Sequence, residues 1–133
     1  MLLPRAHPLA RMRVVPAHLI ARERLVMREA GSMTRETVER AFAAVDLPLE
    51  PWMEVEGREA SREAIAAGLG IGFMSAGELT PDPRFVSRPI GGCRVEMDEY
   101  VVCLRERQRL AIVRAFLDIA AEASRARREA TPG

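Results

Sequence analysis

The sequence lacks lysine altogether, and all 20 of its basic residues are arginine. The 19 acidic residues nearly balance them, so the formal net charge is only +1. A chain with so little net charge has no overall electrostatic preference for nucleic acid or for an acidic surface. Together with the abundance of alanine, the exclusive use of arginine is explained more simply by a GC-rich coding bias than by selection for phosphate contacts.

Long apolar segments are also missing. No apolar run approaches the ~18 residues that a membrane-spanning helix requires. The N-terminal segment is interrupted by Pro4 and Pro8, so it lacks the continuous apolar core of a secretory signal peptide. We expect a cytoplasmic protein that makes no contact with a membrane.

Residues that bind metals or carry out catalysis are scarce. Cys93 and Cys103 belong to no CxxC pair, and no histidine lies at ligand spacing from them, which argues against a zinc site. Neither His7 nor His18 has a serine, cysteine or carboxylate partner in its sequence context. Without a nucleophile–base pair or a set of metal ligands, we expect a binding protein and not an enzyme, with no metal and no cofactor.

What the sequence does contain is an alternation of strand and helix patterns. Its 133 residues, of which 48% are hydrophobic, are enough for one compact domain. Alternating or short apolar runs predict strands, and apolar residues at helical spacing predict helices. Strands are expected at residues 24–28, 52–56, 71–74 and 85–90, a β-rich run at 99–104, and helices at 16–21, 33–45, 57–67 and from 107 onward. The order strand–helix–strand–helix–strand predicts an α/β fold in which helices flank a mixed, mostly parallel sheet.

Two of the expected helices begin with small residues. Helix N-termini attract anions because their first amide groups have no partner within the helix. Ser32 and Thr34 flank the start of the first helix, with Met33 between them, and their hydroxyl and amide groups are candidates for binding a small anion. The alternative is an ordinary N-cap. A capping box is missing, because Arg35 stands where glutamate or glutamine is required.

Two arginines are candidates for a charge-assisted contact with such an anion. Arg35 lies in the first helix, where a solvated surface position is the alternative. Arg58 lies in the first turn of the second helix, where a cation opposes the helix dipole. A residue that breaks this local rule is a candidate for ligand binding, although Glu59 and Glu63 lie close enough in sequence to neutralise it.

The glycines at positions 68, 70 and 72 resemble a dinucleotide-binding fingerprint only superficially. In that fingerprint the glycines follow a strand and open a helix, whereas here they close a helix and open a strand. We therefore expect these glycines to form a turn and to allow close packing between helix and sheet, and we do not expect nucleotide binding.

Four segments occur in the order and approximate spacing of a known family. They are HPLA at 7–10, REAGSMTR at 28–35, REAIAAGLGIGFM at 62–74 and DPRFVSRPI at 82–90. This ordered set resembles the effector-binding domain of LysR-type transcriptional regulators. The resemblance implies the two-lobed fold of type II periplasmic binding proteins, in which a small effector lies between the lobes.

The resemblance also implies how the chain is divided. Residues 1–125 would form a partial effector-binding domain, with a distal lobe at 16–93 and with crossover strands and a returning helix at 1–15 and 94–125. The second lobe would be incomplete, and residues 126–133 would form a flexible tail. In the family, DNA binds to an N-terminal winged helix-turn-helix domain, which this sequence does not include.

For the function, the resemblance implies a homo-oligomer that senses a small organic anion. It places effector contacts on the turn around Ser32 and Thr34, and the full set of expected effector-binding residues is Ser32, Met33, Thr34, Arg35 and Arg58. The segments MEVEGREASREA and EYVVCLRER are similar to a subgroup associated with aminoethylphosphonate metabolism. A phosphonate or a carboxylate is therefore the expected effector.

Two other interpretations are compatible with the same fold class. A solute-binding-protein-like lobe should carry a secretory signal, and none is seen in this sequence. A protein interaction module without a regulatory role would use the apolar face that a missing lobe leaves uncovered. The apparent mass in solution distinguishes this second case, because a strict monomer argues against association.

Overall fold

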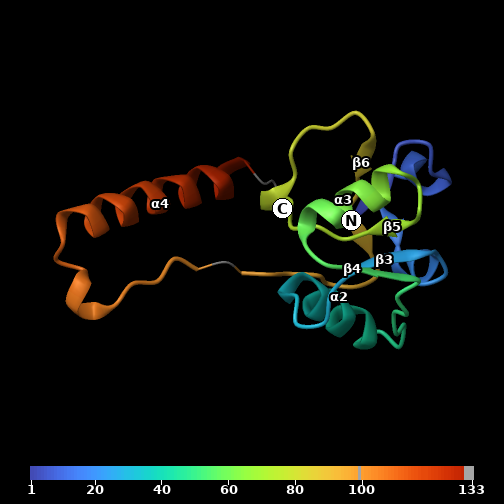
Figure 1. The fold of residues 1–133 in the computed structure, drawn as a ribbon, viewed down its shortest axis with the longest axis horizontal. Coiled ribbons are helices and arrows are strands. Elements are labelled where there is room, and N and C mark those ends of the chain that lie inside the picture. Colours follow the sequence, from blue (N-terminus) through green and yellow to red (C-terminus); the bar gives the residue numbers. More distant parts are fainter. Residues whose placement is uncertain (99, 131–133) are drawn as a thin grey trace. The chain divides into compact units, whose positions relative to one another are not determined.

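The computed structural model describes residues 1–98 and 100–130, which form two separate units. The first unit comprises Met1–Met97 and contains a sheet with helices packed on it (Figure 1). Its strands are β1 (Leu2–Pro4), β2 (Val15–Pro16), β3 (Leu25–Arg28), β4 (Met53–Val55), β5 (Ile71–Gly72), β6 (Phe85–Ser87) and β7 (Ile90–Gly91). Its helices are α1 (Ala17–Ile20), α2 (Met33–Ala43) and α3 (Arg58–Ala66), with short 3-10 turns η1 (Pro8–Arg11) and η2 (Ala76–Glu78).

Five strands of the first unit form one mixed sheet in the order β4-β3-β5-β1-β6. β3 runs parallel to both neighbours, since Val26 is paired with Met53 in β4 and with Gly72 in β5. β1 runs antiparallel to β5 and β6, with Leu2 opposite Gly72 and Ser87. A separate parallel pair joins β2 to β7. The predicted α/β fold and the predicted order of strands and helices from β3 to β5 are confirmed.

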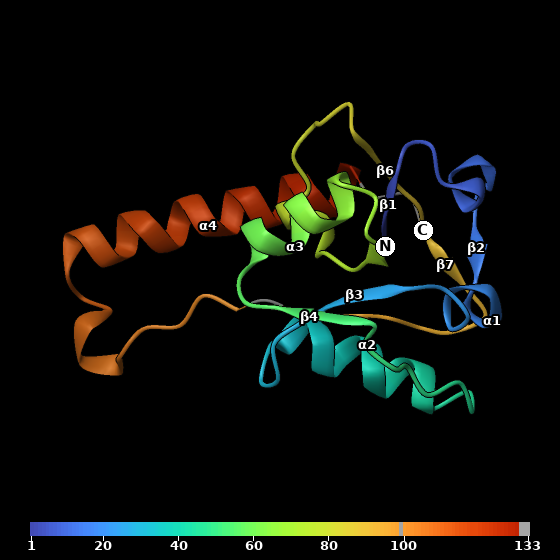
Figure 2. The same ribbon diagram turned by 45° about the vertical axis from the view of Figure 1, so that its right-hand side comes forward.

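α2 and α3 cover opposite faces of this sheet (Figure 2). Successive side chains of a strand point to opposite faces, and β3 supplies both cores in this way. Leu25 and Met27 belong to the buried cluster that contains Phe42 of α2, whereas Val26 belongs to the cluster that contains Ile65 of α3. β3 is therefore apolar throughout because it is buried from both sides, as parallel strands between two helical layers are.

The glycines that follow α3 have the structural role expected from the sequence. Gly68 ends the helix with a φ of +76°, a left-handed conformation that favours glycine. Gly72 lies directly beneath α3, because a Cβ atom there would meet Ile65 Cδ1 at 2.7 Å and the Val26 carbonyl oxygen at 2.8 Å. The absence of a side chain at position 72 thus allows α3 to approach the sheet closely.

The second unit begins at Asp98 and contains the 3-10 turn η3 (Arg105–Arg107) and the helix α4 (Ala111–Ala130). The β-rich run predicted at 99–104 is wrong where it can be compared: residues 100–104 form no strand, and residue 99 lies outside the described residues. Tyr100 and Val102 are 79% and 85% exposed, so their β-forming side chains have no sheet to pack against.

The long helix expected from residue 107 is present as α4. It extends to Ala130, into the segment that we expected to be a tail, and residues 131–133 lie outside the described residues. Within the part of the chain that the structure describes, no helix combines the length and the apolar character needed to cross a membrane.

Candidate functional site

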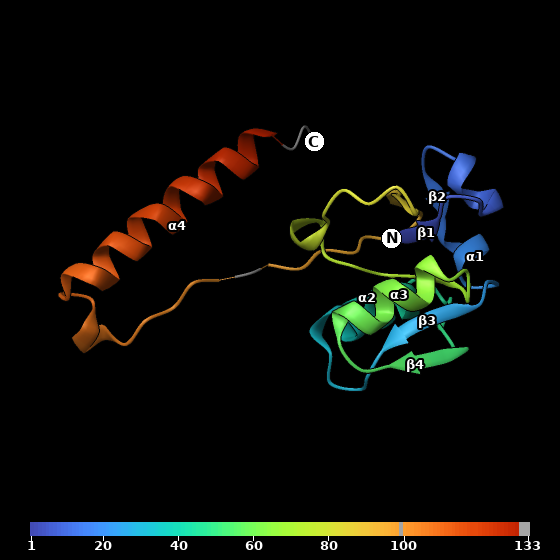
Figure 3. The same cartoon turned by 45° about the horizontal axis from the view of Figure 1, so that its top comes forward.

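The starts of α2 and α3 lie at one edge of the sheet. β3, β4 and β5 are parallel, so their carboxyl ends share an edge, and the loops leading into α2, α3 and η2 all leave from it. Figure 3 shows α2 and α3 beginning on the side to which β3 and β4 point. Although the two helices cover opposite faces, their N-termini therefore meet at the place where ligands bind in open α/β sheets.

The N-terminus of α2 has unpaired polar groups. Ser32 is the N-cap residue, but its hydroxyl makes no capping bond, and no described residue is hydrogen-bonded to its Oγ. Ser32 as a whole residue is nevertheless only 9% exposed. The amides of Met33, Thr34 and Arg35 also have no partner among the described residues, as expected for the first turn of a helix. The ordinary N-cap that we considered as an alternative is thus not formed by the Ser32 side chain.

The two residues after Ser32 are accessible to different extents. Met33 is 61% exposed, and Thr34 is half-buried. The amides of the first helical turn point out of the helix along its axis, because they have no acceptor within the helix. The amides of both residues are therefore available at the start of α2, regardless of how exposed their side chains are.

Arg35 is bound to the protein itself. Its guanidinium forms ion pairs with Glu39 at 2.8 Å and with Glu54 of β4, and it donates a hydrogen bond to the Arg28 carbonyl at 2.8 Å. The carboxylates of Glu39 and Glu54 raise the pKa of Arg35. Its side chain is only 15% exposed, so the solvated surface position considered above does not describe it. Arg35 fastens the first turn of α2 to the ends of β3 and β4.

Arg58 is more accessible. It lies in the first turn of α3, its side chain is 56% exposed, and it pairs with Glu78 of η2. The neutralising partners suggested by the sequence, Glu59 and Glu63, are not the ones used: Glu63 pairs with Arg84 at 2.8 Å. An ion pair made by a half-exposed arginine is weak, so the Arg58–Glu78 contact costs little to break.

Sequence reasoning also missed the ion pair formed by Arg28 and Glu29 at the end of β3. The Arg28 guanidinium binds the Glu29 carboxylate through two hydrogen bonds, at 2.7 and 2.6 Å. The Gly57 amide at the start of α3 donates to the same carboxylate at 3.2 Å. The contact from Arg28 is the largest cause, and together these contacts lower the pKa of Glu29 from 4.5 to about 2. Its carboxylate is therefore ionised at neutral pH. Its position at the carboxyl end of a parallel strand is the signal that could have identified it.

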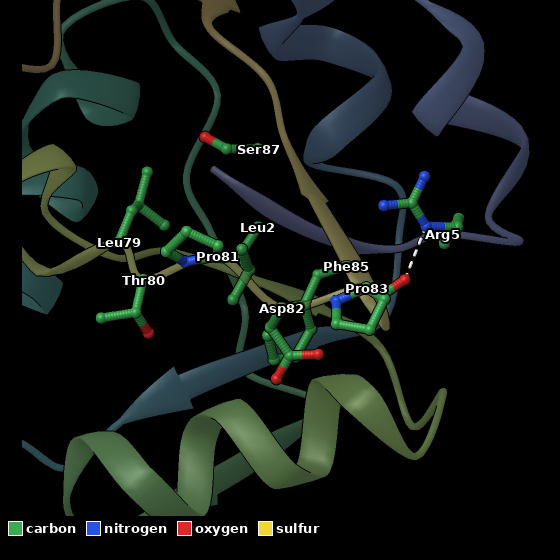
Figure 4. A pocket seen from close by; sticks show the side chains of 9 residues that line it. All are labelled: Leu2, Arg5, Leu79, Thr80, Pro81, Asp82, Pro83, Phe85 and Ser87. Carbon is green, nitrogen blue, oxygen red and sulfur yellow. Dashed lines mark hydrogen bonds between the residues drawn. The ribbon is translucent and has the colours of Figure 1, made fainter.

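A pocket of about 540 Å³ lies elsewhere in the first unit, beside β6 (Figure 4). The buried side chains of Leu2 and Phe85 line it together with the loop at 79–83. Its carboxylate, Asp82, is paired with Arg62 and Arg84. None of the five effector-binding residues expected from the sequence lines this pocket.

The arrangement suits the binding of a small anion better than catalysis. Metal ions need several ligands close together, and no three histidine, cysteine, aspartate or glutamate side chains among the described residues are placed to hold one. The edge instead offers unpaired amides, a serine hydroxyl without a partner among the described residues and an exposed arginine.

Comparison with known proteins decides the family. The family described as LysR substrate binding domain matches residues 1–125. The chain belongs to this family. It is 35% identical over 121 residues to the transcriptional regulator CbbR of Xanthobacter flavus, an alignment that covers 86% of the chain and 36% of the relative. It is 29% identical over 119 residues to the transcriptional activator CmpR of Synechocystis, with 86% and 38% covered.

The structural comparisons agree with this LysR assignment. The regulatory domain of Synechocystis CcmR, solved in complex with 2-PG, superimposes with a TM-score of 0.66 at 24% identity, covering 89% of this chain and 58% of that one. The LysR-family regulator HinK of Pseudomonas aeruginosa gives a TM-score of 0.64 at 19% identity, with 88% and 41% covered. At these identities the likeness shows the fold, which is consistent with the type II periplasmic-binding-protein-like fold.

The chain is thus a LysR effector-binding domain that spans less than two fifths of the length of the curated relatives described above. These relatives are transcriptional regulators, in agreement with the expectation of ligand sensing without catalysis. They are of the CmpR and CbbR type and give no support to the narrower similarity with an aminoethylphosphonate-associated subgroup, which stays a prediction. The division into a lobe at 16–93 and crossover segments also stays a prediction.

Proposed function

We propose that the chain senses a small organic anion on behalf of a transcriptional regulator, and that the anion binds at the N-terminus of α2. The observation that carries this proposal is Ser32, a buried residue at the mouth of a helix whose hydroxyl has no hydrogen-bond partner among the described residues. The first amides of α2 beside this hydroxyl also lack partners, and free donors at a helix N-terminus favour an anion there.

Each expected site residue has a distinct part in the proposal. The Ser32 hydroxyl and the amides of Met33, Thr34 and Arg35 donate to the anion, aided by the positive end of the α2 dipole. The Arg35 side chain acts indirectly, because its ion pairs fix the first turn of α2. Arg58 leaves Glu78 and adds a charge-assisted contact.

For the whole protein we propose the arrangement found in LysR regulators. DNA contact belongs to an N-terminal domain outside this sequence, the protein is a homo-oligomer, and it works in the cytoplasm. A carboxylate or a phosphonate is the proposed effector class. Sensing requires that the effector bind one conformation or subunit arrangement more tightly than another, because equal affinity for both shifts no equilibrium.

Thermal unfolding in the presence of small anions tests the proposed site. An anion at about 100 times its Kd stabilises the folded chain by about 2.7 kcal/mol, which a melting curve detects readily. Ser32→Ala and Arg58→Ala should each reduce this stabilisation. Ser75→Ala is the matched control, because Ser75 also caps a helical turn but already accepts a hydrogen bond from the Gly77 amide at 3.3 Å. If no carboxylate, phosphonate or phosphate raises the melting temperature of the wild type, the proposed pocket does not exist.

A further inference from the structure

The pocket beside β6, which we call the β6 pocket, is separate from the edge where α2 and α3 begin. Its lining residues come from β1, β6, the residue after β1 and the loop at 79–83, and they include neither Ser32 nor Arg58. Leu2 and Phe85 belong to the buried cluster that packs against α3, so the pocket lies on the α3 face of the sheet. Its volume of about 540 Å³ is within the range of ~300–1,000 Å³ in which proteins bind small molecules.

Most of the lining of the β6 pocket is apolar. Leu2 and Phe85, which are 3% and 6% exposed, contribute buried side chains, and Leu79, Pro81 and Pro83 of the loop complete the apolar surface (Figure 4). β1 and β6 are paired antiparallel, so the sheet itself fixes this part of the wall. A preformed apolar lining of this kind favours a ligand with an apolar body.

The charges around the β6 pocket leave one cation unpaired. Asp82 pairs with Arg62 of α3 at 3.4 Å and with Arg84 at 2.8 Å, and Arg84 also pairs with Glu63 at 2.8 Å. These two arginines and two carboxylates neutralise one another, and Figure 4 shows the Asp82 carboxylate directed toward α3. Arg5 takes no part in this cluster, and it has no ion-pair partner among the residues that the structure describes.

Arg5 is nevertheless held in position. Its amide donates to the Arg84 carbonyl at 2.9 Å, next to the paired residues of β1 and β6. Its Nε donates to the Pro83 carbonyl at 2.6 Å (Figure 4). The two terminal nitrogens of the guanidinium, Nη1 and Nη2, form no hydrogen bond with any described residue. Because a guanidinium presents its donors in a fixed plane that matches a carboxylate, this free pair is suited to binding one.

We propose that the β6 pocket binds a small carboxylic acid: the Arg5 guanidinium binds the carboxylate through Nη1 and Nη2, and the side chains of Leu2 and Phe85 contact an apolar body. This second site does not depend on the anion site proposed at α2, because the two share no residue. Both parts of the ligand are needed. An uncharged ligand leaves Arg5 without a partner, and an anion without an apolar body gains only an exposed ion pair, which contributes little.

Three probes separate the two parts of such a ligand. 3-Phenylpropionate has both a carboxylate and a ring, 3-phenylpropan-1-ol has the ring without the charge, and acetate has the charge without the ring. With 3-phenylpropionate, NMR signals of backbone amides should move at the non-proline residues of 2–5 and 79–87 and stay fixed at 32–35. The wild type should bind each of the other two probes more weakly by about tenfold or more, since each lacks one of the two contacts.

Arg5→Gln tests the residue that binds the charge. It should weaken 3-phenylpropionate by about tenfold and leave the affinity for 3-phenylpropan-1-ol unchanged, whereas Arg5→Lys keeps the charge and should retain part of the binding. Arg40→Gln is the matched control, because Arg40 is an exposed arginine of α2, on the opposite face of the sheet, and should change the affinity by less than about twofold. Leu79→Ala should weaken both probes that carry a ring.

Each result decides for or against the β6 pocket. If Arg5→Gln has no more effect than Arg40→Gln, the proposal is overturned. It is also overturned if the amides at 32–35 shift and Ser32→Ala weakens 3-phenylpropionate, because the probe then binds at α2 and the function proposed above gains support. If no amide shifts at millimolar probe, the pocket binds no acid of this kind, and the α2 site is judged by its own test. Circular dichroism melting curves establish that each variant is folded.

Discussion

Replacing Ser61 with alanine should stabilise the protein, which is unusual for a change in a buried position. Ser61 lies on the face of α3 that packs against the sheet, one turn before Ile65, and it is 2% exposed. Its Oγ is buried and has no hydrogen-bond partner among the described residues. The hydroxyl has therefore lost its hydrogen bonds to water without gaining others.

The expected gain follows from three contributions. A buried polar group without a partner costs about 1–3 kcal/mol, which Ser61→Ala recovers. Alanine also has a higher helix propensity than serine, by about half a kcal/mol in a helix interior. Loss of the packing contacts of one oxygen atom offsets roughly 0.5 kcal/mol of this gain, at about 0.1–0.2 kcal/mol for each atom pair. The net effect should be an increase of about 1–3 kcal/mol in the free energy of unfolding.

Urea denaturation measures this change directly. For Ser61→Ala the midpoint should rise while the m-value stays constant, and the melting temperature should rise by about 4–8 °C for each kcal/mol in a unit of this size. Ser75→Ala, which removes a hydroxyl that does form a capping bond, should lower stability by about 0.5 kcal/mol or more. A loss of more than about 1 kcal/mol in Ser61→Ala would show that the hydroxyl is hydrogen-bonded in solution and that the reasoning is wrong.

Three further changes test the packing and the ion pairs. Gly72→Ala should destabilise the protein by about 1–3 kcal/mol in urea denaturation, because the new Cβ would lie 2.7 Å from Ile65 Cδ1 and 2.8 Å from a backbone oxygen; an unchanged midpoint would show that α3 can move away. Phe42→Ala should destabilise the protein by about 3–5 kcal/mol, since Phe42 is fully buried and packs edge-on against Phe73, with 6.0 Å between the ring centroids. Thermal unfolding measures this loss of stability, and a loss of less than about 1 kcal/mol would contradict the assignment of Phe42 to the core. The pKa values of Glu29 and Asp82 are lowered from 4.5 and 3.8 to about 2, chiefly by Arg28 and Arg84, so the unfolded chain binds protons at a higher pH than the folded chain does. The stability that these pairs provide should be complete above about pH 5 and disappear as the pH falls toward 2, and a pH series of urea denaturation curves for the wild type and Glu29→Gln should differ in slope within that range.

The elements around β3 could be predicted from the sequence because local pattern and tertiary environment agree there. The apolar run at 24–28 reads as a buried strand, and the strand is buried from both faces by α2 and α3. The strand predicted at 100–104 is wrong because local pattern and tertiary environment disagree there. Its β-branched and aromatic residues favour a strand, but a strand also needs a neighbouring strand, which the local sequence does not specify.

The sequence predicts candidate site residues at the helix starts, but it does not predict which side chains pair with them. Ser32, Thr34 and Arg58 could be proposed as site residues because helix starts have recognisable residues, and the structure does place them at the starts of α2 and α3. The ion-pair partners of Arg35 and Arg58 could not be predicted, because Glu54 and Glu78 lie in β4 and η2, about 20 residues away along the chain. The contact between Glu29 and the start of α3 could not be predicted, because the Gly57 amide that donates to its carboxylate comes near only in the folded sheet.

The position of β1 has a consequence for how the protein is made. These first residues lie between β5 and β6, with Leu2 opposite Gly72 and Ser87. During translation these residues are synthesised long before either neighbouring strand, so they have no strand partner while the segments of β3, α2, β4 and α3 are being made. Such distant pairing slows folding and leaves an open strand edge in the nascent chain, which is where a chaperone or a misplaced strand would bind.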